Sequence, residues 1–385
     1  MSHQPVRVFV AGDICPIGDL MAPLAQGRTD EVFGDVLPLI AGADYAVGNL
    51  ECPLGRSLTP MRKSGPNLLA DPACATALAR AGFKALGIAN NHIMDFGPEG
   101  LASSLEACKA AGLPTFGGGA TLEEARPLHV VELKGLKVAF LAIAEDEACL
   151  ASPGKAGANP LDPIPVVRTL REAAGTYDRL VVMLHGGNEF FPFPSPWLRD
   201  YCRFLVELGA DVVTCQHTHC VGAMETYRDA TILYGQGNFL FKYASHGSQG
   251  AEGLGLMIHF PDAGPAEVEL HPLGRNPDGP GIRRQAPGQA ETLLSGLRAR
   301  SEVLADPARY RKAWEAYCQE RRPAYFSKML PFGRWFHRFN RRDWMFRFFS
   351  DSALIGLDNA IRCESHRAAL RTGIDLHLGR DLRPD

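Results

Sequence analysis

The stretch "VRVFVAGD" at residues 6–13 decides the fold class of this chain. It is a short run rich in β-branched residues that ends on Gly12 and Asp13. This is the profile of a buried strand that delivers a polar residue at its carboxyl end. We therefore expect a strand that begins near residue 6 and presents Asp13 at the edge of a buried sheet.

Segments of the same kind recur along the chain and alternate with helical patterns. Further strands are predicted at 45–49, 84–89, 137–144, 179–184, 211–215 and 231–234. Helices are predicted between them at 72–82, 98–112, 166–175 and 196–209. This alternation of strand and helix predicts an α/β layered fold.

The composition supports a large folded domain and argues against one class of partner. The 385 residues are 46% hydrophobic, which is enough for a sizeable core, and the length suggests two domains or one large domain with an extension. The formal net charge of −3 gives no long-range attraction to nucleic acid, so no nucleic-acid partner is expected.

Cysteine usage and the first residues predict a cytoplasmic protein. The ten cysteines form no CxxC pair, and Cys74, Cys108 and Cys202 fall in apolar helical patterns. That distribution is typical of buried thiols in a reducing compartment. The start of the chain, "MSHQPVRVFVAGD", lacks the charged and apolar regions of a signal peptide, and no later apolar run is long enough to span a membrane.

The composition changes after about residue 262. A stretch rich in proline and glycine follows, with one short alternating strand, "EVELHPL" (267–273), and residues 289–380 have a mostly helical pattern. We predict a first domain at 1–262 that carries the chemistry and a helical extension at 263–385.

Part of the predicted extension, residues 309–347, is both basic and aromatic and includes Trp314, Trp335 and Trp344. A helix packed across the first domain, with its arginines around the edge, is the interpretation we favour. The alternatives are contact with an anionic membrane surface, and a lid over a cleft that recognises an acidic polymer or a phosphate. No nucleic-acid recognition motif accompanies the basic residues.

Polar residues with metal-binding chemistry follow the predicted strands. Open α/β sheets bind ligands at the edge where the carboxyl ends of their strands lie. The motifs at that edge are "AGDICP" (11–16), "GNLECP" (48–53), "ANNHIMDFG" (89–97), "LHGGNEF" (184–190), "CQHTHCVG" (215–222) and "GQGNFLF" (235–241).

These motifs combine carboxylates, amide oxygens and imidazoles, which suit Mn²⁺, Zn²⁺ or Fe better than Ca²⁺ or a thiolate cluster. His217 and His219 stand two residues apart on an expected extended strand end, so both side chains would point to the same side. Two metal ions ~3.5–4 Å apart would clamp the oxygens of a displaced ester. His92 directly follows Asn91 and is placed to protonate the leaving oxygen.

Each of these residues also has an ordinary structural interpretation. Asp13 could be a helix N-cap, Asn91 a turn residue in the left-handed conformation, and His185 a hydrogen-bonded core histidine. Cys15 and Cys52 are expected to be buried thiols rather than ligands. Because independent structural roles would rarely coincide at the strand ends of one sheet edge, we interpret the set as a metal site.

In this order, the motifs resemble those of the CapA family, named for capsule and poly-γ-glutamate synthesis proteins. That family is itself similar to calcineurin-like metallophosphoesterases. The resemblance runs from about residue 6 to 262 and includes "GD", "NLE.P", "ANNH..D.G.EGL", "H.G.E" and "GNF" segments. In "LGADVVTCQHTHCVG" (208–222), Gln216 and Thr218 depart from the commoner residues of the family.

The resemblance implies a metallophosphoesterase-like four-layer α/β/β/α sandwich followed by the helical extension. It also implies two divalent metal ions, Mn, Zn or Fe, with His92 as the proton donor. The implied metal ligands are Asp13, Glu51, Asn91, His185, His217 and His219.

One departure concerns the first metal position. Metallophosphoesterases usually open with Asp-x-His, whereas this chain has Asp13-Ile14-Cys15, and Glu51 stands where an aspartate commonly bridges the metals. CapA-type chains share the loss of that histidine. One metal position could therefore be weak, empty or differently occupied.

Further residues are candidates for supporting the ligands or binding substrate: Asn49, Lys63, Asp95, Glu99, Glu189 and Asn238. The loop that contains Lys63 resembles one in the family, which makes this lysine a candidate for an anionic substrate group, with a solvated loop lysine as the alternative. Asp95, Glu99 and Glu189 are expected to orient ligand histidines, as carboxylates do behind many metal sites.

The sequence thus predicts a dinuclear-metal hydrolase that acts on a phosphoester, or on an amide bond of an acidic polymer such as poly-γ-glutamate, in capsule or exopolymer biosynthesis. One alternative is a non-catalytic accessory component of capsule polymer assembly, supported by Cys15 at the usual histidine position. Another is a membrane-surface interaction protein that works through 309–347. The substrate is expected to be an anionic small molecule or polymer, and the sequence does not fix the oligomeric state.

Overall fold

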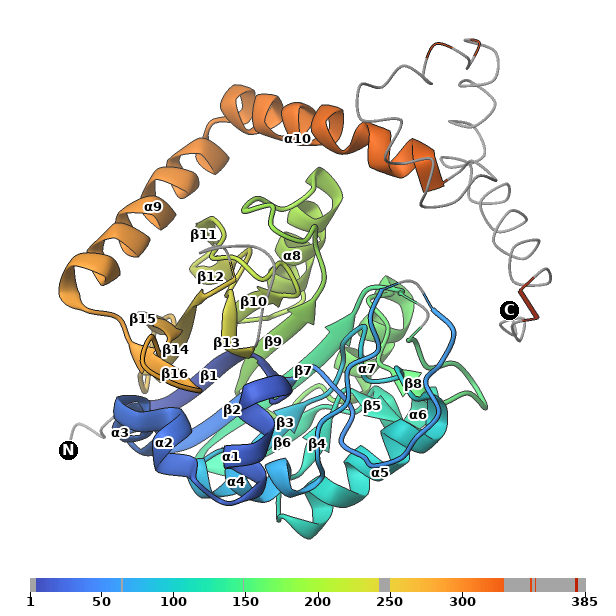
Figure 1. Cartoon of the computed structure of the whole chain (residues 1–385). Helices are drawn as coiled ribbons and strands as arrows, with labels where there is room; N and C mark the ends of the chain where they lie inside the picture. Colours follow the sequence, from blue (N-terminus) through green and yellow to red (C-terminus); the bar gives the residue numbers. More distant parts are fainter. Residues whose placement is uncertain are drawn as a thin grey trace. The chain divides into compact units, whose positions relative to one another are not determined.

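A computed structural model describes residues 5–63, 65–147, 149–241 and 250–328, together with 347, 350, 378 and 379. The chain divides into two compact units, Met1–Pro307 and Ala308–Asp385. The first unit contains the two large β-sheets, a small two-stranded sheet and the candidate site (Figure 1).

The first sheet has eight strands in the order β16-β15-β14-β1-β2-β3-β4, with β13 paired to the end of β1. The strands β1 to β4 run parallel to one another, and β14, β15 and β16 are added antiparallel. Their bounds are β1 (Val6–Cys15), β2 (Tyr45–Leu50), β3 (Ala85–Gly87), β4 (Thr115–Phe116), β13 (Asn238–Phe241), β14 (Glu252–Phe260), β15 (Glu267–Arg275) and β16 (Ile282–Arg284).

The second sheet has six strands in the order β11-β12-β10-β9-β7-β6, and its central strands are parallel. Their bounds are β6 (His129–Leu133), β7 (Leu136–Ala144), β9 (Arg179–His185), β10 (Val212–Gln216), β11 (Met224–Tyr227) and β12 (Ala230–Leu233). A small two-stranded sheet joins β5 (Gly118–Gly119) to β8 (Gly157–Ala158).

Helices cover the outer faces of the two large sheets, giving the four layers α/β/β/α (Figure 1). The helices α4 and α5 lie on the first sheet, and α7 and α8 lie on the second. The helical bounds are η1 (Gly18–Leu20), α1 (Met21–Ala25), α2 (Thr29–Phe33), η2 (Gly34–Val36), α3 (Leu37–Ala41), α4 (Ala73–Ala81), α5 (Gly97–Ala110), α6 (Leu122–Ala125), α7 (Pro163–Glu172), α8 (Pro196–Glu207), α9 (Pro287–Ala305) and α10 (Pro307–Lys328).

The main core lies between the two sheets. The centroid of the Phe140 ring on β7 lies 5.9 Å from the ring centroid of Tyr45 on β2 and 6.1 Å from that of Phe116 on β4. Close packing of the sheets also needs Gly117, which has φ +85° and whose Cβ would lie 2.6 Å from that of Ala142. Removing these apolar faces from water holds the sheets together and so fixes the relative positions of their edges.

Local signals explain where the helices on the second sheet begin. Ser195 is the N-cap of α8 and accepts a hydrogen bond from the backbone nitrogen of Leu198 at 3.1 Å, with Pro196 at the first helical position. Asp162 caps α7 in the same way, followed by Pro163. A side-chain acceptor before a proline is a strong start signal, because it satisfies an amide that the helix leaves unpaired.

All the strands and helices predicted within 1–262 are present, with bounds that shift by a few residues. The domain boundary predicted at 262 is wrong, because β15 and β16 pair with the first sheet beyond it and the compact unit continues to Pro307. The strand predicted at 267–273 is confirmed as β15, but it pairs with β14 inside the first sheet, and the stretch rich in proline and glycine also contains the edge strand β16.

The predicted helical extension is confirmed for α9 and α10 as far as residue 328. Trp335 and Trp344 lie outside the described residues, together with all of 329–346 in the segment 309–347 that was considered for membrane contact. Among the helices that are described, none is long and apolar enough to cross a membrane.

Candidate metal centre

The carboxyl ends of parallel strands from both sheets meet at the site. In the first sheet, Asp13 on β1 is in register with Asn49 on β2 and with Asn238 on β13. In the second sheet, Gln216 at the end of β10 is in register with His185 at the end of β9. The register of β1 shifts around Asp13, and such irregularities commonly redirect a side chain at a site.

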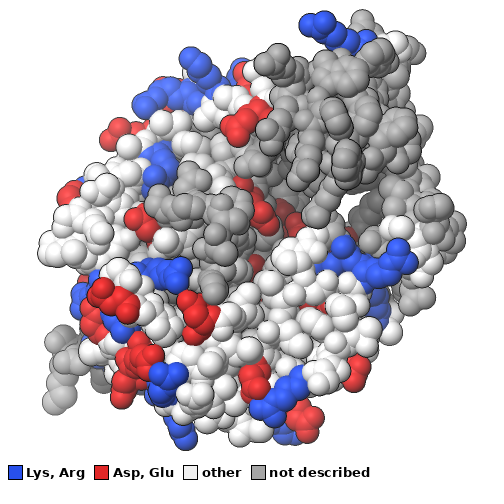
Figure 2. Space-filling model, in the orientation of Figure 1, with Lys and Arg blue, Asp and Glu red and all other residues white. Residues whose placement is uncertain are grey.

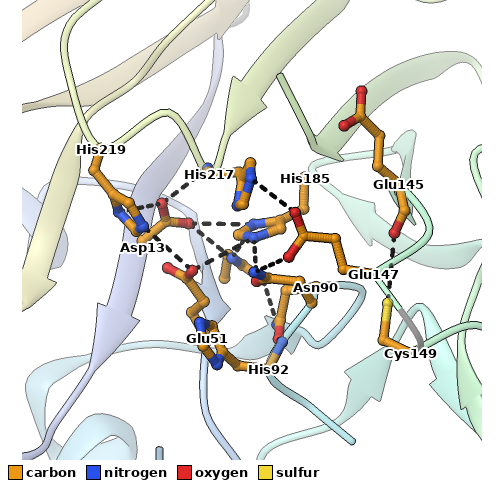
Figure 3. A network of polar contacts seen from close by, with 12 residues as sticks. Asp13, Glu51, Asn90, His92, Glu145, Glu147, Cys149, His185, His217 and His219 are labelled. Carbon is orange, nitrogen blue, oxygen red and sulfur yellow. Dashed lines mark hydrogen bonds and ion pairs between the residues drawn. The ribbon is translucent and has the colours of Figure 1, made fainter. Parts of the chain in front are cut away.

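Five of the six predicted metal ligands form two overlapping groups (Figure 3). Within each group, one candidate ligand atom from each residue lies within 4.8 Å of the others, and all the residues are buried. The groups are Asp13 with Glu51 and His185, and Glu51 with His217 and His219. Glu51 is common to both, which is the position that a carboxylate shared by two ions would occupy.

The Glu51 carboxylate is buried without a hydrogen-bond partner. Its side chain is 0% exposed, and neither oxygen accepts a hydrogen bond. The nearest opposed groups are His185 Nε2 at 3.4 Å and His219 Nε2 at 3.7 Å from Oε1. Burial, together with the charge of Asp13, raises the pKa of Glu51 to about 8. A carboxylate withdrawn from water and left unpaired costs several kcal/mol, so these residues fit a cation.

The two histidines of the "HTH" motif supply neutral nitrogen ligands. Burial lowers the pKa of His219 to about 4, and burial and the neighbouring imidazoles lower the pKa of His217. Each ring is therefore neutral at neutral pH and has one unprotonated nitrogen, which metal binding requires. The backbone nitrogen of His217 donates to Asp13 Oδ2 at 3.0 Å, which ties this turn to β1.

The expected reason for the convergence of these histidines is wrong. The strand β10 ends at Gln216, and His217 and His219 both have left-handed backbone conformations, with φ of +84° and +52°. The turn after the strand, rather than strand alternation, brings their rings to within 6.0 Å of each other. Such conformations are strained for residues with side chains and are typical of functional sites.

A chain of amides anchored to the backbone orients His185. Asn90 donates to the Leu50 carbonyl at 2.8 Å and to Asn49 Oδ1 at 3.1 Å. Asn49 Nδ2 is then directed at Asp13 Oδ1, 2.8 Å away, and at His185 Nδ1, 3.1 Å away. With Nδ1 engaged, Nε2 of His185 faces Glu51 and Asn91. The sequence analysis placed Asn49 here and missed Asn90, although the doubled asparagine of "ANNH" was the available signal.

Behind the ligands lies a buried charged triad of His92, Asp95 and Lys63. His92 Nδ1 lies 2.7 Å from Asp95 Oδ2, and Lys63 Nζ pairs with Asp95 Oδ1. The Lys63 ammonium also donates to the Asn91 carbonyl at 3.1 Å, and its side chain is 4% exposed. Lys63 is therefore not a solvated loop lysine, and its ammonium group is directed at Asp95 and the Asn91 carbonyl rather than at solvent.

The loop after β7 adds a carboxylate that the sequence analysis missed. Glu147 Oε2 accepts a hydrogen bond from Asn91 Nδ2 at 3.0 Å, and Oε1 lies 3.7 Å from His217 Nε2 (Figure 3). On the same loop, burial raises the pKa of Glu145 to about 6. The acidic run "AEDEA" follows a strand end, which was the same signal that identified the other motifs.

The remaining predicted residues divide between the site and the surface. Asn238 Oδ1 lies 2.8 Å from His219 Nδ1, so this amide contacts a candidate ligand. The expectation for Glu99 is wrong, because it lies exposed on the first turn of α5, and Glu189 also lies at an exposed position.

Cys15 is buried and belongs to neither ligand group, and burial and Cys52 raise the pKa of its thiol. Over the described residues of the face in Figure 2, acidic and basic side chains are intermixed.

Comparisons with known proteins identify sequence relatives. A capsule biosynthesis protein CapA of Bacillus anthracis is 28% identical over 316 residues, covering 80% of this chain and 75% of that protein. The PGA biosynthesis protein CapA of Bacillus subtilis is 28% identical over 220 residues, 56% of this chain and 58% of the relative. A 5'-nucleotidase from Candida albicans is a structural neighbour with a TM-score of 0.41 and 8% identity, covering 78% of this chain and 59% of that one.

A family model gives the broader assignment. The model described as bacterial capsule synthesis protein PGA_cap matches residues 7–243, which include all six strand-end motifs. That match covers more than half of the 385 residues. The chain therefore belongs to the bacterial capsule synthesis protein PGA_cap family.

Proposed function

We propose that this protein is a metal-dependent hydrolase of capsule or exopolymer biosynthesis. Its substrate would be a phosphoester, or an amide bond in an acidic polymer such as poly-γ-glutamate. The observation that carries the proposal is the buried carboxylate of Glu51, which has no hydrogen-bond partner and lies with the neutral imidazoles of His217 and His219 in one ligand group. The residues that would hold two divalent ions are Asp13, Glu51, Asn91, His185, His217 and His219.

Divalent ions bound there would polarise the bond to be broken and the attacking water. The protein's own contribution is the fixed geometry of the ligands. Asp13 is held by Asn49 and by the backbone of His217, and His185 is oriented by the amide chain. Because these supports are buried and hydrogen-bonded, the site needs little reorganisation when substrate binds.

His92 is the residue that would protonate the leaving atom. Its Nδ1 faces the Asp95 carboxylate, and a carboxylate accepts hydrogen bonds, so Nδ1 carries a hydrogen. The Lys63 ammonium is a donor too, so its 3.3 Å approach to Nδ1 is a close contact rather than a second hydrogen bond. The groups that accept hydrogen bonds from Lys63 are the Asp95 carboxylate and the Asn91 carbonyl. This arrangement leaves Nε2 of His92 for proton transfer.

The names of the relatives support the biological setting. Two of them are described as capsule biosynthesis and PGA biosynthesis proteins, and the family model carries a capsule synthesis description. The acidic polymer substrate is taken from that likeness. The phosphoester alternative comes from the chemistry of the ligand set, because paired divalent ions suit displacement at phosphorus.

A non-catalytic accessory role is the second candidate, and Cys15 favours it. This thiol occupies the position where a metallophosphoesterase has a histidine, and it lies outside both ligand groups. One ion would then have fewer protein ligands than the other. A Mycobacterium tuberculosis relative, 26% identical over 175 residues, is described as a probable polyglutamine synthesis accessory protein.

The two candidates differ in turnover. Purified protein would be analysed for bound metal, and then assayed with Mn²⁺ on a generic phosphodiester and on a γ-glutamyl oligomer. The hydrolase proposal expects bound metal and hydrolysis of one substrate that is lost in His219→Ala. It also expects His92→Gln to keep the metal and lose about 10²-fold or more in kcat. Bound metal with no turnover on either substrate would favour the accessory role. No metal and no effect of His219→Ala would exclude the hydrolase.

A further inference from the structure

Glu147 stands apart from the other residues of the site because it faces solvent. Its side chain is 51% exposed, whereas its two contacts at the site, Asn91 and His217, are 6% and 4% exposed. It comes from the loop after β7, which supplies none of the candidate ligands. A carboxylate on the solvent side of a buried ligand cluster can either bind the metal ion itself or position a residue that does.

The contact with Asn91 determines which end of that amide faces the ligands. An asparagine side chain has an oxygen at one end and an NH₂ group at the other, and only the oxygen can bind a metal ion. Glu147 Oε2 accepts from Nδ2 at 3.0 Å, so the NH₂ group is directed at the carboxylate. The oxygen Oδ1 is thereby turned towards His185 Nε2, 3.0 Å away.

Two other asparagines of the site, Asn49 and Asn90, are oriented without Glu147. Asn90 is fixed by the Leu50 carbonyl and by the backbone nitrogen of His92, and Asn49 is fixed in turn by Asn90. Within the described part of the chain, the hydrogen bonds of the Asn91 side chain go to His185 and to Glu147. The Glu147 carboxylate is the only one of these two partners that requires the NH₂ end, because an ionised carboxylate has no hydrogen to donate.

We propose that Glu147 is a positioning residue that locks the Asn91 amide with its oxygen towards the metal ion. The inference rests on the proposed metal centre and adds a residue that lies outside the six strand-end motifs. Because Glu147 is half exposed, the lock lies where an incoming substrate meets the site. Direct ligation by Glu147 is the competing explanation, since Oε1 lies 3.7 Å from His217 Nε2. However, Glu147 belongs to neither group of converging ligand atoms.

The test compares two backgrounds that differ at the locked residue. An aspartate at position 91 has an oxygen at both ends, so Asn91→Asp removes the need for a lock while keeping the shape of the side chain. The affinity for Mn²⁺ alone would be measured by calorimetry for the wild type, for Glu147→Ala and for Glu147→Gln, each with Asn91 and with Asn91→Asp. Asp146→Ala, an exposed carboxylate on the same loop, is the matched control for loop charge.

With Asn91 present, Glu147→Ala is expected to weaken Mn²⁺ binding by about 10–100-fold, the usual effect of losing an outer-sphere partner. Glu147→Gln keeps an oxygen that can accept the amide hydrogen and is expected to lose less. Asp146→Ala is expected to change the affinity by less than about 3-fold. In the Asn91→Asp background, Glu147→Ala is expected to leave Mn²⁺ binding unchanged or stronger, because it also removes a like charge from the new carboxylate.

Equal losses from Glu147→Ala in both backgrounds would overturn the lock and show direct ligation or a general charge effect. No loss with Asn91 present would overturn it as well. A wild-type protein that binds no Mn²⁺ would instead overturn the proposed function together with the inference. Thermal melting of the metal-free variants provides the folding check, and we expect it to be unchanged because the Glu147 side chain is half exposed.

Discussion

Two glutamates in this protein, the fully buried Glu51 and the partly buried Glu225, satisfy their carboxylates in opposite ways. Glu225 on β11 accepts hydrogen bonds from Arg199, from both Nε and Nη2 of Arg203, and from the hydroxyl of Tyr234. Despite its burial, these partners lower the pKa of Glu225 to about 2. Glu51 has no such partner, and burial and Asp13 raise its pKa to about 8.

The difference separates a structural carboxylate from a functional one. The charge of Glu225 is neutralised within the protein, so nothing further is required for stability. The Glu51 oxygens have no hydrogen-bond donor, and the nearest basic group, His185 Nε2, lies 3.4 Å away, so a proton or a cation from solution is needed to satisfy them. The presence of a buried carboxylate therefore indicates little until its partners are counted, and the unpaired one marks the site.

The largest expected difference between the two glutamates concerns metal affinity. We predict that Glu51→Gln weakens Mn²⁺ binding by about 10²-fold or more, since metal sites with four protein ligands gain ~3 kcal/mol or more from each. The matched substitution Glu225→Gln should leave the affinity within a factor of two. Calorimetric titration of both variants measures this, and equal affinities would contradict a ligand role for Glu51.

The next difference concerns stability without metal. Glu225→Gln is expected to lower the free energy of unfolding by about 1–3 kcal/mol, because it removes the partly buried carboxylate that pairs with two arginines. Glu51→Gln removes an unpaired acid and should cost nothing, or stabilise the metal-free protein. Urea unfolding at pH 7 measures both changes. A larger loss for Glu51→Gln than for Glu225→Gln would reverse our assignment of the two residues.

The two glutamates should also give opposite dependences of stability on pH. The pKa of Glu51 is raised in the folded state, so its contribution is complete below about pH 4.5 and is lost as the pH rises through about 8. The pKa of Glu225 is lowered, so its contribution is complete above about pH 4.5 and is lost as the pH falls towards 2. Each substitution to glutamine should flatten the dependence only in its own window. Urea unfolding of the metal-free variants across pH provides the test.

The smallest expected effect concerns a residue beside the site. Cys15 belongs to neither ligand group, so Cys15→Ala should change Mn²⁺ affinity by less than about 3-fold. It should cost about 1 kcal/mol of stability through lost packing of a fully buried side chain. A loss of affinity comparable to that of Glu51→Gln would show that the thiol takes the place of the missing histidine as a ligand.

The strand ends explain why much of the site could be predicted from the sequence. Asp13, Asn49 and His185 each follow an apolar run, and parallel pairing brings such ends to one edge without any detailed knowledge of packing. The alternation of strands and helices predicted an α/β layered fold, whereas the four-layer order came from the resemblance to the family.

The errors arise where contacts depend on the path of a loop. Lys63 was taken for a surface or substrate-binding residue, because nothing local indicates that its loop folds back onto Asp95. Glu99 was expected to orient a ligand histidine, but it is exposed on the first turn of α5. Glu147 reaches Asn91 across 56 positions, a contact that no short pattern records.

The proposed metal centre requires a cation among side chains that lie far apart in the sequence. The direct measurement is an anomalous difference map from crystals of the protein grown with Mn²⁺. We predict a peak bounded by Asp13, Glu51, His185 and His219, with ligand distances of roughly 2.0–2.3 Å. A map in which Mn²⁺ is absent from this cluster, while Glu51 remains buried and unpaired, would contradict the account.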